Sequence, residues 1–137
     1  MASRRATFIL YDLEVVVERI EGECTCRMRI GDRVRLRSGK LSLPAGRDFC
    51  LYALQAAIPL LPAKQRAGQP ADWMETDTRV TCPDPACRLI MRIDRVARRT
   101  LRHDDVSTVA YRTGGERRRS SPERDRTARR RTGQRGR

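Results

Sequence analysis

The stretch TFILYDLEVVVERI, Thr7–Ile20, decides the fold class because it is rich in β-branched and aromatic side chains. Within it, apolar residues alternate with acids, Leu13, Val15 and Val17 against Asp12, Glu14 and Glu18. This period of two predicts a strand with one buried face. The pattern returns in RVRLR, Arg33–Arg37, where Val34 and Leu36 share one face and three arginines share the other. Together they indicate an antiparallel sheet with one solvated side.

One helix is expected after these strands. Residues 38–46 form a turn-rich connection, and Asp48 is expected to cap a helix over residues 49–57. An apolar stripe at helical spacing, made of Leu51, Leu54, Ile58 and Leu61, is expected to face the core. Pro59 and Pro62 predict the end of this helix, and a polar loop follows over residues 63–72.

Two further strands are predicted in the second half of the chain. They are TRVTC, residues 78–82, and RLIMRIDRV, residues 88–96, joined by a turn at Pro83-Asp84-Pro85-Ala86. Trp73 and Met74 are expected to anchor the preceding loop. The resulting order, β-β-α-β-β, predicts an α+β domain: a small antiparallel sheet with one main helix packed on one face. This domain is expected to span residues 7–97, followed by an extension over 98–113 that is either a short helix or an edge strand.

The basic charge gathers at the C-terminal end. From residue 98 onward there are fourteen arginines and five acids, a net charge of +9 out of the total of +13. Residues 114–137 contain no large apolar side chain, so they are expected to be a disordered tail. Its clustered arginines are candidate phosphate contacts for non-specific binding of RNA or DNA: Arg117, Arg118, Arg119, Arg129, Arg130 and Arg131. A solvated tail without a dedicated partner is the alternative.

The chain shows no secretory signal and no apolar run near the roughly 20 residues that span a bilayer. These features predict a cytoplasmic protein, without a membrane partner, whose thiols stay reduced. The folded part is also close to the lower size limit for a self-sufficient core. A structural metal would supplement such a core.

Five cysteines occur in three places along the chain. Cys24 and Cys26 follow the first strand, Cys50 lies at the helix start, and Cys82 and Cys87 flank the proline turn. If the loops at one end of the sheet bring them together, thiolates suit zinc or an iron–sulfur cluster. The candidate ligands are Cys24, Cys50, Cys82 and Cys87, with Cys26 as the other choice for the fourth.

Two alternatives to metal binding stay open for these cysteines. Neither Cys24-x-Cys26 nor Cys82-x₄-Cys87 has the spacing of a zinc knuckle, and free cysteine also packs as a small buried hydrophobe. A nucleophilic Cys50, close to the helix start and to Arg47, is the other alternative. It would need a base, and His103 is the only histidine.

Short motifs along the chain carry a family resemblance. They are Gly22-x-Cys24, Gly31-Asp32, Leu43-Pro44-x-Gly46, Phe49-Cys50-x-x-Ala53-Leu54, Leu60-Leu61-Pro62-Ala63-Lys64-Gln65-Arg66, Asp72-Trp73, Asp77 and Cys82-Pro83-Asp84-Pro85. Over residues 11–96 the chain resembles a family of small prokaryotic uncharacterised repeat proteins. The resemblance implies that Cys24, Cys50 and Cys82 occupy family positions and that Arg27-Met28 replaces a Gly-His pair. It implies no reaction, so we expect a small accessory protein rather than an enzyme.

Overall fold

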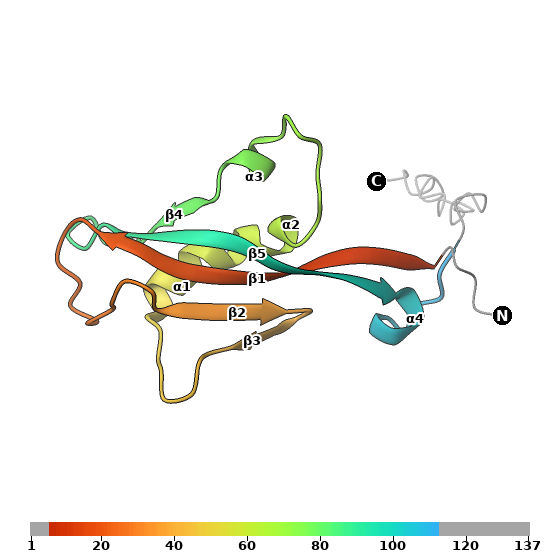
Figure 1. Ribbon diagram of the computed structural model, residues 1–137, viewed down its shortest axis with the longest axis horizontal. Coiled ribbons are helices and arrows are strands. Elements are labelled where there is room, and N and C mark those ends of the chain that lie inside the picture. The colour runs from red at the N-terminus through yellow and green to blue at the C-terminus, as the bar shows by residue number, and fades with distance from the viewer. Residues whose placement is uncertain (1–5, 113–137) are drawn as a thin grey trace, which may run out of the picture.

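A computed structural model of the chain describes residues 6–112 as a five-stranded antiparallel sheet with short helices (Figure 1). The strands are β1 (Thr7–Ile20), β2 (Arg33–Arg37), β3 (Lys40–Ser42), β4 (Arg79–Thr81) and β5 (Leu89–Arg102), in the order β3-β2-β1-β5-β4. The helical segments are α1 (Leu51–Ala57), the 3₁₀ turn η1 (Ile58–Leu60), α2 (Leu61–Lys64), α3 (Trp73–Thr76) and α4 (His103–Val106). The predicted α+β class with an antiparallel sheet is confirmed. The predicted tail over 114–137, with its candidate arginines, lies outside the described residues.

Two long strands form the centre of the sheet. β1 and β5 pair from Thr7 opposite Arg102 to Ile20 opposite Leu89, with bulges at two places along the ladder. β5 therefore continues well past residue 96, where the sequence pattern predicts its end, and it crosses the expected domain boundary at residue 97. The unassigned extension is thus strand up to Arg102 and then the single-turn helix α4.

The alternating pattern of β1 and β2 predicts the core of the sheet correctly. Leu13, Val15 and Val17 are buried, and they pack with Leu89 and Met91 of β5 in one hydrophobic cluster. Complete burial of such a side chain contributes about 1.5–3 kcal/mol. The opposite face of β2 carries its three exposed arginines, as the alternation predicts.

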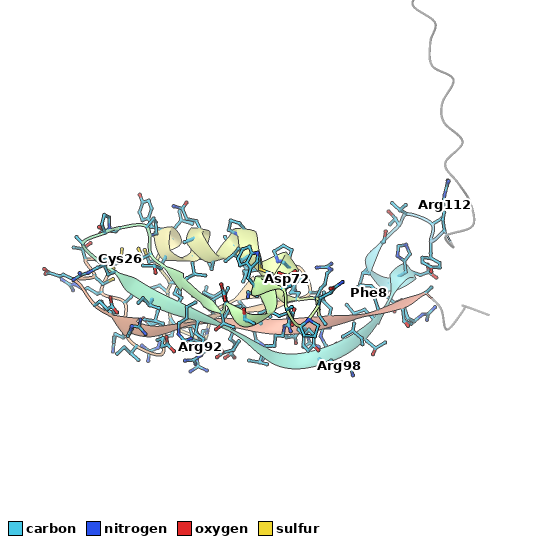
Figure 2. The ribbon with its side chains drawn as sticks, turned by 90° about the horizontal axis from the view of Figure 1, so that it is seen from above. Phe8, Cys26, Asp72, Arg92, Arg98 and Arg112 are labelled. Atoms are coloured by element: carbon cyan, nitrogen blue, oxygen red, sulfur yellow. The ribbon has the colours of Figure 1, made fainter. Side chains whose placement is uncertain are left out.

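The predicted apolar stripe of the helix is wrong in part. Leu51 is 67% exposed and Ile58 is 42% exposed, whereas Leu61 of the stripe is buried in the core cluster together with Ala53 and Ala57. Both sets have helical spacing, so periodicity alone does not choose between them. The small alanines let the helix backbone come close to the sheet. Figure 2 shows the helical segment Leu51–Lys64 along one face, with Arg92 pointing away on the other.

The structure also corrects the predicted ends of the helix. The N-cap of α1 is Cys50 rather than Asp48, and no side chain bonds to this cap. Pro62 does not end the helical segment, because it occupies the first turn of α2, where its missing N–H costs nothing. The segment therefore continues to Lys64, whose side chain is buried at the edge of the core.

Two features of the connecting loops differ from the prediction. The turn-rich segment over residues 38–46 contains the edge strand β3, which pairs with β2. Trp73 is not a buried anchor, since it is 61% exposed at the start of α3. That loop ends instead at Asp72, the N-cap of α3, whose carboxylate accepts the N–H of Met74 at 2.9 Å.

No helix within residues 6–112 has the length and apolar character that a bilayer span requires.

Candidate functional site

All five cysteines line one cavity of about 180 Å³ at the end of the sheet where β1 ends and β5 begins. We call it the cysteine cavity; the rest of its lining comes from Thr25, Met28, Tyr52, Ala53, Asp84 and Leu89. The candidate ligands Cys24, Cys50, Cys82 and Cys87 are thus brought together, although they lie in three separate segments. Cys26, the expected alternative to Cys87 as fourth ligand, belongs to the same lining.

The continuation of the central ladder places Cys24 beside Cys87. Beyond β1, the N–H of Gly22 donates to the carbonyl of Cys87 at 2.9 Å, and the N–H of Glu23 donates to that of Ala86 at 3.0 Å. The two backbones approach so closely at Gly22 that a Cβ there would lie 2.0 Å from the oxygen of Ala86. Glycine is therefore required at this position for the cysteine loops to meet.

The proline turn places Cys82 and Cys87 on either side of one loop. Cys82 donates its N–H to Leu89 at 2.8 Å, which extends the pairing of β4 with β5. The carbonyl of Asp84 accepts the N–H groups of both Cys87 and Arg88, and its carboxylate accepts that of Ala86 at 2.9 Å. The predicted turn over residues 83–86 is confirmed.

The third contribution comes from the loop after Cys24 and from the start of α1. Arg27 donates its N–H to the carbonyl of Cys24 at 3.2 Å, closing a turn that carries Cys26. Met28 is buried below this turn, and its Sδ accepts the N–H of Cys50 at 3.4 Å. This contact holds the N-cap of α1 against the loop, so that Cys50 and Cys26 line the same cavity.

The residues that follow two of the cysteines in sequence have strained backbone conformations. Arg27 has φ of 57° and Arg88 has φ of 46°, so each residue after Cys26 and Cys87 adopts the left-handed conformation. For a side chain other than glycine this costs on the order of 1 kcal/mol. Strain of this kind is common at functional sites, where surrounding structure holds it in place.

The thiols of the cavity influence one another electrostatically. A hydrogen bond with Cys50, followed by repulsion from Cys50 and then by desolvation, raises the pKa of Cys26. Burial is the main cause that raises the pKa of Cys87 to about 11; a hydrogen bond from the backbone of Leu89 opposes it, and the neighbouring thiol of Cys24 adds to it. Both groups are therefore thiols at neutral pH. A metal cation supplies the positive charge that favours the thiolate instead.

The cavity fits a thiophilic metal in its donor types but not in its side-chain arrangement. Cysteine sulfurs are the donors that zinc and iron–sulfur clusters prefer. Within residues 6–112, however, no group of three or more His, Cys, Asp or Glu side chains is arranged to hold an ion. Binding would therefore need the thiols to rotate toward a common centre.

A cysteine–histidine catalytic pair is not formed in the described part of the chain. His103 starts α4, at the end of the molecule opposite α1, and its Nε2 contacts the carbonyl of Val109 (Figure 1). Cys50 consequently has no imidazole beside it to act as a base. The nucleophile hypothesis for Cys50 loses its only histidine partner.

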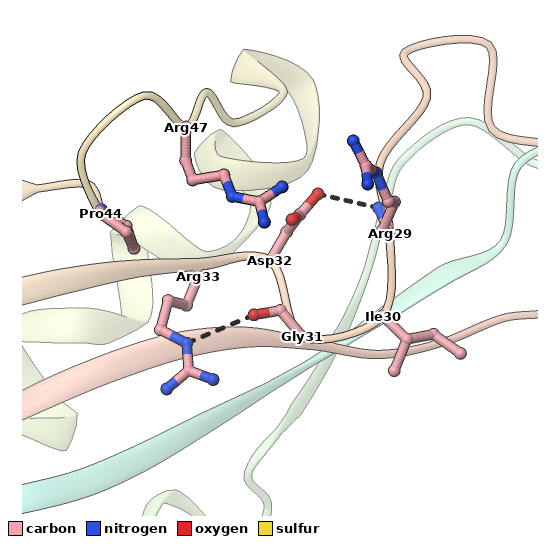
Figure 3. A pocket seen from close by; sticks show the side chains of 7 residues that line it. All are labelled: Arg29, Ile30, Gly31, Asp32, Arg33, Pro44 and Arg47. Atoms are coloured by element: carbon pink, nitrogen blue, oxygen red, sulfur yellow. Dashed lines mark hydrogen bonds between the residues drawn. The ribbon is translucent and has the colours of Figure 1, made fainter.

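A second cavity of about 430 Å³ lies next to the first. Its lining consists of Arg29, Ile30, Gly31, Asp32, Arg33, Pro44 and Arg47 (Figure 3). Figure 3 shows Arg29 and Arg47 on either side of Asp32, whose carboxylate accepts the backbone N–H of Arg29 at 2.8 Å. The loops of the cysteine cavity continue into this one through Met28-Arg29 and through Arg47–Cys50. We call it the arginine cavity.

Most arginines of the sheet have carboxylate partners, unlike two of the arginines that line this cavity. Arg79 binds Glu18 with two hydrogen bonds, at 2.7 and 2.9 Å, and the bonding lowers the pKa of that carboxyl. Arg99 binds the buried Asp12 at 2.9 Å. By contrast, the guanidinium groups of Arg29 and Arg47 form no ion pair with any other residue between 6 and 112.

Comparisons with known proteins give no relative for this chain: no family model, no curated protein and no solved structure matches it. The resemblance drawn from its short motifs therefore stays a prediction.

Proposed function

We propose that this chain is a small accessory protein that binds zinc or an iron–sulfur cluster through the cysteine cavity. The observation that carries the proposal is the gathering of five cysteines from three separate segments around one cavity. Cys82 and Cys87 also belong to the hydrophobic core cluster, with Cys24 and Cys50 packed against it, but core packing does not account for the exposed Cys26 in the same lining. Two strained residues and a glycine at a backbone contact maintain the loops that carry them.

The buried thiols are the best candidates for permanent ligands. Cys82 and Cys87 are buried, and Cys24 and Cys50 are half-buried, so a cation bound among them would be shielded from water. Cys26 is exposed at the mouth of the cavity and is the spare thiol in a site of four ligands. The volume of about 180 Å³ accommodates either a single ion or a small cluster. The volume therefore does not distinguish the two cofactors, and chemical analysis of bound metal and sulfide must do so.

The test is metal analysis of the full chain purified without oxygen. We expect one zinc per chain, or iron with matching acid-labile sulfide, and protection of at least three thiols from titration. Cys82→Ser should lose the metal, whereas Thr25→Ala, which changes the same lining without removing a sulfur, should keep it. Absence of stoichiometric zinc and iron, with all five thiols titrating freely, would refute the proposal.

A second candidate function is association with RNA or DNA through arginine side chains. The observation that favours it is the arginine cavity, where Arg29 and Arg47 lack carboxylate partners in the described residues. Guanidinium groups bind phosphate oxygens with paired hydrogen bonds, and such binding weakens steeply with salt. The arginines of residues 114–137 would add further phosphate contacts.

Retention on nucleic acid at low salt tests this candidate. We expect retention by the full chain, strong weakening when the chain stops at Thr113, and further weakening with Arg47→Gln in the shortened chain. Arg79→Gln is a matched control, since Glu18 already neutralises Arg79. Full retention by the shortened Arg47→Gln chain would exclude a contribution from residues 114–137 and from Arg47.

A further inference from the structure

The five thiols of the cysteine cavity are not equivalent in their neighbours or in their access to solvent. Cys26 is exposed and lies two residues before Met28, whose Sδ accepts the backbone N–H of Cys50 at 3.4 Å. Cys24 lies two residues after Gly22, whose N–H donates to the carbonyl of the buried Cys87 at 2.9 Å. The lining of the cavity therefore places Cys26 near Cys50 and Cys24 near Cys87, and the first pair includes the exposed thiol.

We propose that Cys26 and Cys50 form a reversible disulfide, which makes the mouth of the cysteine cavity a site of oxidative modification. The loop geometry holds both residues in place. The turn closed by Arg27 and Cys24 presents Cys26, while the contact between Met28 and the N–H of Cys50 fixes the start of α1 against the same loop. These contacts keep both cysteines on the lining of one cavity.

The co-reactant is a small disulfide such as glutathione disulfide. The thiol of Cys26 first loses its proton to solvent, and the resulting thiolate attacks one sulfur of the oxidant, so that a mixed disulfide forms and one glutathione leaves as its thiolate. The thiolate of Cys50 then attacks the sulfur of Cys26 and releases the second glutathione. The protein loses two electrons and two protons, and the oxidant becomes two thiols. Cys26 is the first point of attack because it is the exposed member of the pair.

The disulfide also has a consequence for metal binding, and this part rests on the proposed function. Cys50 would no longer be available as a ligand, so a site of four cysteines would retain only three. Oxidation should then release zinc or open a cluster. The same cross-link forms in protein that has never held metal, so the two ideas can be tested separately.

The experiment treats reduced, metal-free full-length protein with glutathione disulfide, stops the reaction by alkylation and maps cross-linked peptides by mass spectrometry. We expect the Cys26–Cys50 cross-link to appear first and a reductant to reverse it. Cys26→Ser should abolish this cross-link, and the variant should fold normally because Cys26 is exposed. Cys82→Ser should retain it.

The outcomes separate this inference from the proposed function. A first cross-link between other cysteines, or stable glutathione adducts with no cross-link, would overturn the inference whatever the metal content. Metal analysis before oxidation tests only the proposed function. If metal is present and the cross-link forms, oxidation of the loaded protein should release the metal, and Cys26→Ser should slow this release at least tenfold.

Discussion

Replacement of Gly22 by alanine should open the cysteine cavity, because Gly22 is the point of closest backbone approach beside it. The added Cβ would lie 2.0 Å from the oxygen of Ala86 and 2.7 Å from that of Cys87, where contacts below 3.0 Å essentially never occur. Both oxygens belong to the backbone and cannot rotate away. The loop that carries Cys24 must therefore move about 1 Å or more from the loop that carries Cys87.

This displacement should break the hydrogen bonds from Gly22 to Cys87, at 2.9 Å, and from Glu23 to Ala86, at 3.0 Å. Each is worth about 0.5–1.5 kcal/mol, so the free energy of unfolding should fall by about 1–3 kcal/mol. For a domain of this size the melting temperature falls by about 4–8 °C per kcal/mol, which circular dichroism measures directly. Gly39→Ala is the control, since a Cβ there meets nothing within 4 Å. Equal melting of Gly22→Ala and the unsubstituted protein would refute this account of the loops.

Three further predictions concern the rest of the fold. Lys64 is buried and donates to the carbonyls of Met74 and Asp77, so Lys64→Met should lower the free energy of unfolding by about 2–5 kcal/mol in denaturant titration, whereas the exposed Lys40→Met should leave it unchanged. The hydrogen bond from Arg95 is the main cause that lowers the pKa of Glu75 from 4.5 to about 2, so this carboxylate stabilises the fold fully above pH 4.5 and loses its effect as the pH falls toward 2. The melting temperature of Glu75→Gln should accordingly be below that of the unsubstituted protein near pH 6 and equal to it near pH 2; a constant difference would contradict this. Leu51→Gln should change the free energy of unfolding by less than about 0.5 kcal/mol because Leu51 is exposed, and a loss above 2 kcal/mol would restore the apolar stripe that the sequence predicts.

Strand alternation proved the most dependable sequence signal. In β1 and β2 a slip of one residue would turn every apolar side chain toward solvent, so the pattern and the structure agree closely. The buried face of the helix was harder to predict because two sets of residues have helical spacing. One is the expected stripe that begins with Leu51 and Leu54, and the other contains the buried Ala53 and Ala57. The choice depends on how closely α1 approaches the sheet, and no local pattern records that distance.

The cysteine site was predictable only in part. The position of Cys24, Cys50 and Cys82 at strand and helix ends suggested that they meet, and the structure places them around one cavity. The sequence offered Cys26 only as an alternative to Cys87, because its place in the lining depends on the turn closed by Arg27 and on Met28, which is buried below that turn. Arginine in a left-handed conformation carries no sequence signature comparable to that of glycine.

The two ends of the described chain lie together, since the N–H of His103 donates to the carbonyl of Ala6 at 2.7 Å. Figure 2 shows Phe8 and Arg112 at one extremity of the molecule and Cys26 at the other. A support or fluorophore coupled at Phe8 or Arg112 would lie far from the exposed Cys26. Protein immobilised in this way is therefore suited to labelling of Cys26, because the attachment does not block the reagent.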